Sequence, residues 1–235
     1  MKLNSQLTIN QQSTPLVRHD IRLALNNPGR ATFVVRAKQP LFTKAIVKMA
    51  LGYGDDLQQV FVGYIERITP VDKHQQQLFC RELTGALHYP LPMNLRHITL
   101  NGVLNQMATH TGLSFITPEQ SYCTTKIPYF YSLNNGIFAM ASIAQAFNIA
   151  DYCWQQQGNG QVYVGSWQHS YWVDKPVEIP ERFFINHQSH NSAQIAAIPH
   201  IRPGVRLEDN SRIKQTQINN NQMVITWSKP SSGLY

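Results

Sequence analysis

The chain has 235 residues, of which 43% are hydrophobic, 10% aromatic and 14% charged. This composition excludes an intrinsically disordered chain, and the length excludes a small scaffold held together by disulfides. The formal net charge is +7, but Lys and Arg are scattered singly and form no basic run of the kind that binds nucleic acid. Few charges beside abundant Gln, Asn, Thr and Tyr indicate a surface that packs against neighbouring subunits.

Cysteine usage and the N-terminal residues indicate the compartment. Cys80, Cys123 and Cys153 are odd in number and have no CxxC spacing, so we predict buried free thiols. Residues 1–6 lack an apolar signal segment, and no stretch approaches the ~18 apolar residues that a membrane helix requires. We therefore expect synthesis and folding in a reducing cytoplasm, without a membrane segment.

Residues 1–90 are predicted to form a first β-barrel-like domain. Pro28 and Gly29 predict a turn, and the Gly- and Asp-rich loop 52–56 predicts that the runs on either side of it pair as an antiparallel hairpin. Alternating or β-branched patterns predict strands at 7–9, 21–25, 31–36, 45–51, 59–68 and 78–83.

Residues 91–150 are predicted to be an α+β insert with two short helices. The first helix follows Thr99 as N-cap and ends at Gly112, because apolar residues recur at helical spacing between them. The second helix begins near Asn134 or Asn135 and runs to Phe147. We expect both helices to cover a sheet.

Residues 151–235 are predicted to be a second β region with a small C-terminal β module. Residues 152–156 and 161–167 form the clearest hairpin, joined by a turn at residues 158–160. Residues 176–198 contain strand candidates and a polar loop, 186–192. Three short strands at 201–207, 211–218 and 222–227 complete the chain. The predicted fold class is thus mainly β, with two small β-barrel-like domains around the insert.

Nine histidines suggest a metal site, but their surroundings argue against one. His187 and His190, with His169 before and His200 after them, lie among Gln, Asn and Ser with no acidic pair to orient them. A solvated polar loop is the preferred interpretation. His97 and His110 flank the first helix and are interpreted as capping or surface residues. We therefore predict no metal, no cofactor and no cofactor-binding residue.

The sequence also lacks a recognisable catalytic set. Ser166 and His169 are close in sequence, but the Gly-x-Ser-x-Gly elbow of a hydrolase is absent. The acidic pairs 55–56 and 208–209 are typical of turns, where carboxylates accept hydrogen bonds from backbone N–H groups. The remaining candidate acids stand alone in strand-like runs: Glu66, Glu82 and Glu178. We predict that the protein is not an enzyme.

Six aromatic residues concentrate around the clearest hairpin. A well-packed sheet with Tyr and Trp at its edge is preferred over a stacking platform for sugars or bases. The six are Tyr152, Trp154, Tyr163, Trp167, Tyr171 and Trp172.

Four ordered segments resemble the hub proteins of phage tails, the family of the Mu-like 43-kDa tail protein, the late control protein D group and the hub part of type VI secretion spikes. The segments are the hairpin 51–65, the helix and its terminator at 99–113, the hairpin 154–167, and the entry to the last strands at 201–204. The resemblance spans about residues 30 to 230, and its strength lies in the order and spacing of the segments.

The resemblance implies a homotrimeric ring with pseudo-sixfold symmetry that joins a hexameric tail tube to a trimeric spike or tip. The implied partners are therefore the tail tube protein and the spike or tip protein, and the implied location is the virion. No spike-like or lytic extension is expected after Tyr235. The scattered basic residues, Arg202 and Arg206 among them, are expected to face the lumen or a neighbour.

The alternatives to a hub protein are a nucleic-acid-binding β-barrel protein, motivated by the pI of about 9.4, and a tail-borne cell-wall hydrolase.

Overall fold

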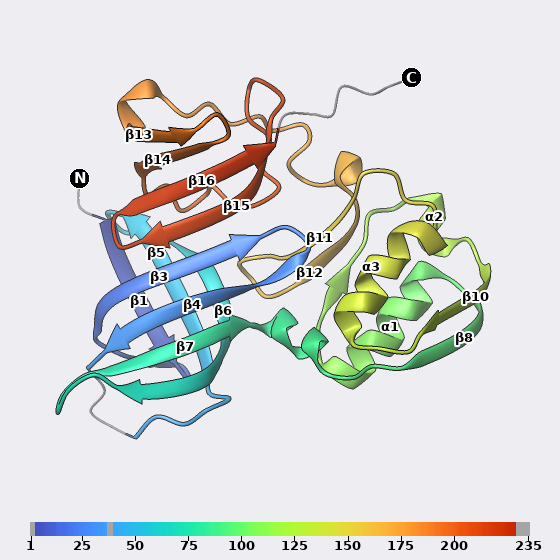
Figure 1. Ribbon diagram of the computed structural model, residues 1–235, viewed down its shortest axis with the longest axis horizontal. Coiled ribbons are helices and arrows are strands. Elements are labelled where there is room, and N and C mark those ends of the chain that lie inside the picture. Colours follow the sequence, from blue (N-terminus) through green and yellow to red (C-terminus); the bar gives the residue numbers. More distant parts are fainter. Residues whose placement is uncertain (1–2, 37–39, 229–235) are drawn as a thin grey trace.

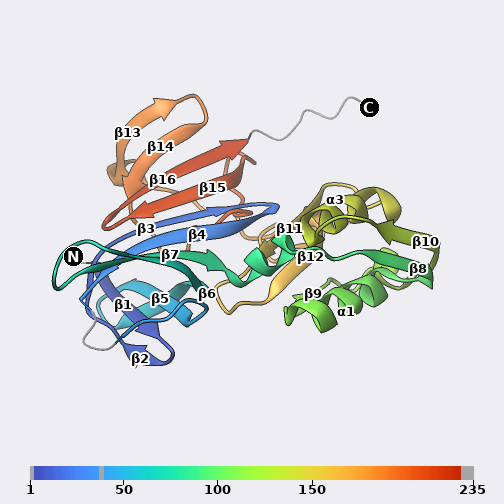
Figure 2. The same cartoon turned by 60° about the horizontal axis from the view of Figure 1, so that its bottom comes forward.

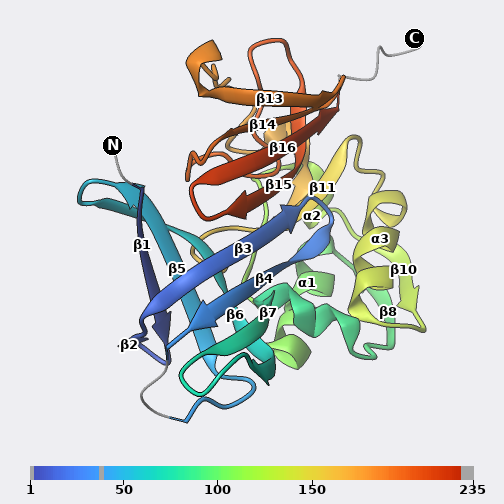
Figure 3. The same cartoon turned by 60° about the vertical axis from the view of Figure 1, so that its left-hand side comes forward.

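A large curled antiparallel sheet dominates the structure, a computed structural model that describes residues 3–36 and 40–228 except for the side chains of residues 187 and 188. In this part of the chain, eleven strands form the sheet in the order β13-β14-β16-β15-β3-β4-β7-β6-β5-β1-β2. Figure 3 shows that the sheet curls into a half-barrel. Its strands are β1 (Leu3–Ile9), β2 (Gln12–Ser13), β3 (Leu16–Ala24), β4 (Asn27–Val35), β5 (Ile46–Tyr53), β6 (Asp56–Pro70), β7 (Gln76–Glu82), β13 (Phe184–Ser189), β14 (Ser192–Ala196), β15 (Arg212–Asn219) and β16 (Gln222–Ser228).

The concave face of the sheet holds the main hydrophobic core. Side chains along β3, for example, alternate between buried and partly exposed from His19 to Ala24, which is the two-residue period of a strand with one buried face. Phe33 and Phe61 are fully buried and meet edge to face, with 5.9 Å between ring centroids. The predicted mainly β fold with an α+β insert is confirmed.

Strands from the N-terminal and C-terminal parts of the chain meet in this one sheet. β15 pairs antiparallel with β3, with Ile218 opposite Ile21 and Gln215 opposite Ala24. The two β regions of the sequence are therefore continuous in space, and residues from both contribute to one core.

The predicted hairpin on either side of the loop 52–56 is confirmed. β5 and β6 pair antiparallel, with Tyr53 opposite Asp56, and Gly54 in the turn adopts a left-handed conformation with φ of 67°. Gly63 on β6 lies opposite Glu82 of β7, and a Cβ atom there would stand 1.9 Å from the carbonyl oxygen of Arg81. Glycine at this position therefore permits the close approach of β6 and β7.

The turn predicted at Pro28 and Gly29 is wrong. Both residues lie inside β4, and the chain reverses instead at Leu25 and Asn26. Asn26 has φ of 58°, which asparagine tolerates better than most residues. Its side-chain oxygen accepts a hydrogen bond from Trp154 N at 2.8 Å, so the turn is held by tertiary contact as well.

The insert has a hydrophobic core of its own. Both predicted helices are confirmed: Thr99 caps the first by accepting a hydrogen bond from Gly102 N, and Asn135 caps the second by accepting one from Phe138 N. α3 packs on the buried face of the β8–β10 pair (Figure 2). The elements of the insert are the 3₁₀ helix η1 (Leu83–His88), β8 (Met93–Ile98), α1 (Leu100–Thr111), β9 (Phe115–Ile116), α2 (Ser121–Thr124), β10 (Ile127–Ser132) and α3 (Gly136–Ala146).

The second predicted hairpin is also confirmed. β11 (Tyr152–Gln156) and β12 (Val162–Ser166) pair antiparallel, and β12 pairs in parallel with β9 of the insert. The hairpin lies between the insert and the large sheet (Figure 1). Two short 3₁₀ helices follow, η2 (Trp167–His169) and η3 (Glu181–Phe183). Among the helices of the described residues, none has the length and apolar character needed to cross a membrane.

Two predictions for the C-terminal third need correction. Residues 201–207 are a turn-containing segment with isolated bridges, Val177 to Leu207 and Arg206 to Arg212, rather than a strand. Residues 186–192, predicted to be an irregular polar loop, form the end of β13, the turn that follows it and the first residue of β14, and these two strands pair as a β hairpin. The strands predicted at 211–218 and 222–227 are confirmed as β15 and β16.

Candidate functional site

Two of the histidines weighed as metal ligands, His169 and His200, contact different partners. His169 Nδ1 lies 3.1 Å from the hydroxyl of Tyr122, and His200 Nε2 lies 2.8 Å from Gln58 Nε2. His190 lies in the turn after β13, and the side chain of His187 is outside the described residues. Within residues 3–36 and 40–228, no three His, Cys, Asp or Glu side chains come together in a way that would hold a metal ion.

The serine and the acids weighed as catalytic groups have local structural partners. Ser166 Oγ accepts a hydrogen bond from Gln168 N at the start of η2, whereas His169 contacts Tyr122. Glu66 accepts a hydrogen bond from Arg81 Nε at 2.7 Å. Ser166 therefore caps η2, His169 contacts Tyr122 and Glu66 pairs with Arg81, and these structural contacts explain the three side chains.

The three cysteines are buried and free, as predicted. Burial raises the pKa of Cys153 to about 12 and raises that of Cys80 further. Because the thiolate is the reactive form of cysteine, both side chains are poor nucleophiles at neutral pH.

Glu82 anchors a buried polar junction between the large sheet and the C-terminal segment. Its Oε2 accepts a hydrogen bond from Gly29 N at 2.6 Å, and its Oε1 lies 3.9 Å from Arg202 Nη2. A Cβ atom on Gly29 would stand 2.7 Å from the Glu82 carboxyl, so the approach requires glycine. Burial raises the pKa of Glu82 to about 7, although Arg202 and the Gly29 N–H both act to lower it.

The other side of the junction ties three separate segments together. Arg202 donates to the carbonyl oxygens of Val60 on β6 and Gln156 on β11, at 2.6 and 3.1 Å. The side chain of Gln156 in turn donates to Val62 O and accepts from Thr84 N, at 2.8 and 3.0 Å. The junction therefore fixes the hairpin β11–β12 and residues 197–207 against the wall of the half-barrel.

The expectation that Arg202 faces a lumen or a neighbouring subunit is wrong. Only 13% of its side chain is exposed, and its guanidinium makes the contacts just described. Arg206 donates to Val173 O at 2.7 Å and to Asn210 Oδ1. The sequence did not reveal that Arg202 joins separate segments, because it donates to backbone carbonyl oxygens far away in the chain, those of Val60 and Gln156.

A second charged contact joins β15 to the hairpin. Arg212 donates to both carboxylate oxygens of Asp151, at 2.9 and 2.5 Å, and its guanidinium lies 3.8 Å from the ring centroid of Trp167. Burial raises the pKa of Asp151, but the hydrogen bonds and charge of Arg212 outweigh this effect and hold that pKa below its usual value. Trp167 Nε1 donates to Gly204 O at 2.8 Å.

The aromatic residues around this hairpin mostly serve packing. Trp154, Tyr163 and Trp167 are buried, and Tyr171 is exposed with its ring edge against Trp172. The preferred interpretation, a packed sheet rather than a stacking platform, is confirmed for the three buried rings.

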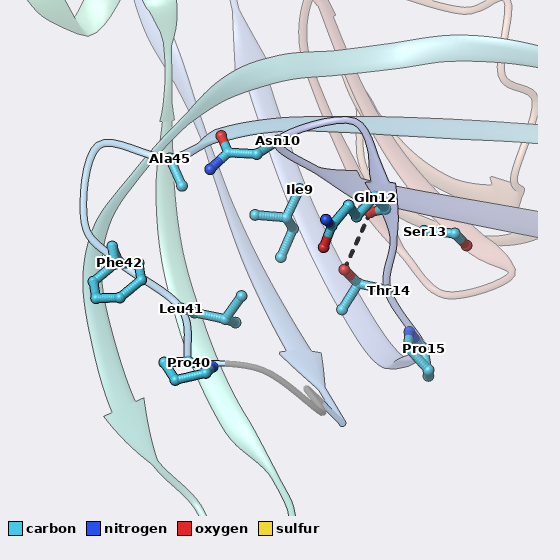
Figure 4. A pocket seen from close by; sticks show the side chains of 10 residues that line it. All are labelled: Ile9, Asn10, Gln12, Ser13, Thr14, Pro15, Pro40, Leu41, Phe42 and Ala45. Carbon is cyan, nitrogen blue, oxygen red and sulfur yellow. Dashed lines mark hydrogen bonds between the residues drawn. The ribbon is translucent and has the colours of Figure 1, made fainter.

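A pocket of about 450 Å³ opens at the end of the half-barrel, beside β1 and β2 (Figure 4). Figure 4 shows the side chains of Ile9, Leu41 and Phe42 directed toward it. Among the described residues, those that line it are uncharged: Ile9, Asn10, Gln12, Ser13, Thr14, Pro15, Pro40, Leu41, Phe42 and Ala45.

The outer face of the β8–β10 pair exposes two tyrosines of β10, with Arg96 of β8 opposite Tyr129 and Asn94 opposite Tyr131. Tyr129 and Tyr131 alternate with the buried Phe130 and Ser132, so they project from the opposite side of β10, and Leu133 follows directly after the strand. The two tyrosine rings lie 5.7 Å apart, and Leu133 is 81% exposed. An exposed apolar cluster of this kind is typical of a protein interaction surface.

Comparison with known proteins places this fold. No family model matches the sequence. An uncharacterized 58.7 kDa protein in the lys 3′ region of Haemophilus phage HP1 (strain HP1c1) is 30% identical over 226 residues, which cover 96% of this chain and 42% of that protein. The chain thus spans less than half the length of the phage relative.

Three solved structures share the fold over nearly the whole chain. The tail protein from Neisseria meningitidis MC58 has a TM-score of 0.70 at 11% identity and 97% coverage of both chains. The 43 kDa tail protein of prophage MuSo2 from Shewanella oneidensis has a TM-score of 0.68 at 10% identity and 96% coverage of both. An Escherichia coli component of the type VI secretion system, which is structurally similar to the phage T4 tail proteins gp27 and gp5, has a TM-score of 0.63 at 8% identity, covering 96% of this chain and 77% of that one.

The chain therefore has the fold of two tail proteins, one of them from a prophage, and of a type VI secretion component, and the resemblance inferred from the sequence is confirmed at the level of the fold. The HP1 protein adds a relative that is encoded by a phage.

Proposed function

We propose that the protein is a structural subunit of a phage or prophage tail. The observation that carries this proposal is the end-to-end match to two tail proteins, one of them from a prophage, which covers 96–97% of both chains in each pair. The sequence relative from phage HP1 supports the same context. The protein accordingly belongs to the virion, with assembly in the host cytoplasm.

Within the tail, the proposed role is that of the hub. Three copies form a ring of pseudo-sixfold symmetry that joins the hexameric tail tube to the trimeric spike or tip. The domains proposed for this role are residues 1–90, the insert 91–150 and residues 151–235. The support is the likeness to a type VI secretion component that is itself similar to the T4 proteins gp27 and gp5, together with a surface poor in charge.

The role is a structural one without catalysis or cofactor. Its support is that Glu66, Glu82 and Ser166 have pairing or capping partners and that the three thiols are buried. The neighbours in fold are tail and secretion-apparatus proteins rather than characterised enzymes.

Labelling of assembled tails tests the proposal. A tagged copy of the chain, expressed with the other tail genes of its element, should be found by electron microscopy at one end of the tail tube, next to the spike. Deletion of its gene should leave tubes without a spike or abolish tube initiation. Complete, spike-bearing tails that lack the chain would contradict the proposal.

The main alternative, a nucleic-acid-binding β-barrel protein, makes a different prediction. Such a protein would bind DNA with an affinity that falls steeply with salt, because it would release counterions from the phosphates. The burial of Trp154, Tyr163 and Trp167 removes three of the rings on which bases would stack. Retention on DNA that is lost steeply between about 50 and 200 mM salt would favour the alternative.

A further inference from the structure

Three arginines stand in line on the outer face of the large sheet. Arg22 of β3 lies opposite Arg30 of β4, and Arg30 lies opposite Arg81 of β7. We call these three residues the arginine row. The three strands are neighbours in the sheet (Figure 1). The residues on either side of each arginine along its strand are buried, so the three side chains point away from the core.

The arginine row places like charges side by side. Residues directly opposite each other in a sheet have Cβ atoms about 4.5–5.5 Å apart, and like charges at that spacing destabilise the sheet. The two outer arginines have a counterion: Arg22 Nε lies 3.3 Å from Asp20 Oδ1, and Arg81 Nε lies 2.7 Å from Glu66 Oε2. The side chain of Arg30 has no hydrogen bond, ion pair or ring contact with any described residue. The middle of the row therefore carries a positive charge that nothing in the described chain neutralises.

The outer face around the arginine row is positive and open to a partner. The side chains of Arg22 and Arg81 are 42% and 31% exposed, and Arg30 is exposed as well. The guanidinium groups of Arg67 and Arg81 lie 5.7 and 5.4 Å from the ring centroid of Phe79, which orders them over the sheet. Five positive and two negative charges lie on this face, a net charge of +3: Arg18, Arg22, Arg30, Arg67 and Arg81 against Asp20 and Glu66.

We propose that the arginine row docks an acidic segment of a partner protein, with a partner carboxylate on Arg30. A guanidinium donates two parallel hydrogen bonds to one carboxylate, and a new negative charge at this point relieves the repulsion within the row. Asp20 and Glu66 already hold the outer arginines in this way. The same two acids would repel the continuous phosphates of a nucleic acid, which is why a protein is the favoured partner. The inference does not depend on the trimeric ring.

Two variants separate the arginine row from the overall charge of the chain. Arg30→Gln removes the unneutralised charge and keeps a polar side chain. Arg96→Gln is the matched control, because Arg96 is also an exposed arginine on a strand, β8, and the net charge falls by one in both variants. Arg30→Gln should keep or raise the thermal midpoint, since it removes a like charge from between two others. A clear loss of stability would give Arg30 a structural role and overturn the proposal.

A short peptide in which glutamate alternates with threonine is the probe, and the same peptide with glutamine for glutamate is its uncharged control. Titration followed by nuclear magnetic resonance reports both affinity and place. The glutamate peptide should shift the backbone amide signals of the arginine row in the wild type and in Arg96→Gln, and the glutamine peptide should not. Arg30→Gln should weaken binding of the glutamate peptide by about three- to fivefold, as for a well-placed exposed ion pair. Added salt should weaken the binding further by screening.

Four results of the titration would overturn the proposal. Equal losses of affinity in Arg30→Gln and Arg96→Gln would show that the peptide responds to net charge alone. Absence of saturable shifts at millimolar peptide would show that the arginine row does not bind carboxylates. Tighter binding of single-stranded DNA of the same length, with shifts at the same residues in about 150 mM salt, would assign the row to nucleic acid. Self-association of the wild type that Arg30→Gln abolishes would assign it to a second copy of the chain.

Discussion

Glu82 and His19 are ionisable side chains that the fold buries, and burial shifts the pKa of each toward its neutral form. Desolvation raises the pKa of Glu82 to about 7 and lowers that of His19 to about 4. The Nε2 atom of His19 is buried and has no hydrogen-bond partner among the described residues. Both groups therefore contribute to a pH-dependent stability, in opposite directions.

We expect Glu82→Gln to change the pH dependence of unfolding. Between the ordinary glutamate pKa of 4.5 and the folded pKa of about 7, unfolding releases the proton of Glu82, so rising pH favours the unfolded state. The free energy of unfolding of the wild type should therefore fall, relative to that of Glu82→Gln, by up to roughly 3 kcal/mol across this window. Urea denaturation at a series of pH values measures this difference.

Comparison with Glu82→Gln separates the contribution of Glu82 to the pH dependence of stability from that of His19. The neutral imidazole of His19 destabilises the fold as pH falls from 6.5 toward 4, but it does so equally in both proteins. A difference that stays flat with pH would contradict the raised pKa of Glu82. A wild-type free energy of unfolding that rises with pH relative to that of Glu82→Gln would mean that the charge of Arg202 outweighs burial.

The β5–β6 hairpin and its neighbour β7 show how one glycine sets the spacing of strands. Gly63 lies where a Cβ atom would stand 1.9 Å from a backbone oxygen of β7, whereas Gly54 in the turn has no neighbouring atom within 4 Å of that position. Glycine is needed at Gly63 for space and at Gly54 for its positive φ.

We expect Gly63→Ala to destabilise the fold by about 3 kcal/mol, because a backbone atom cannot move aside without breaking the β6–β7 ladder. Gly54→Ala is the control and should cost only about 1 kcal/mol, the strain of a left-handed alanine. Thermal and urea unfolding measure both changes. Equal losses in the two variants would mean that the sheet relaxes around the added methyl group.

At the scale of the whole molecule, a few long-range contacts hold the insert and hairpin to the large sheet. The Arg212–Asp151 pair joins β15 to the start of β11 through two hydrogen bonds. The stacking of Arg212 on Trp167 adds a contact that a lysine would not reproduce.

We expect Arg212→Lys to lower the free energy of unfolding by about 1–2 kcal/mol, because it loses the bidentate geometry and the stacking while keeping the charge. A double-mutant cycle with Asp151→Asn should give a coupling energy of about 1 kcal/mol. A coupling energy near zero would show that the pair is screened by solvent, since Asp151 is 34% exposed.

The local elements of this protein could be predicted from its amino-acid sequence alone. Thr99, Gly112 and Asn135 mark the ends of helices because capping and the left-handed conformation depend on nearby backbone groups. The two hairpins followed from alternation and short glycine-rich connections for the same reason. The order of these elements was also sufficient to identify the fold.

Features that depend on residues far apart in the chain became visible only in the folded structure. The pairing of β15 with β3 and the contacts of Glu82 with Gly29 and Arg202 join positions that no local pattern relates. Pro28 and Gly29 show the same limit, because a sequence typical of a turn lies inside β4, where Gly29 N donates a hydrogen bond to Glu82 of β7. The exposed position of Tyr129 and Tyr131 is likewise decided in three dimensions, since packing buries Phe130 on the other side of β10.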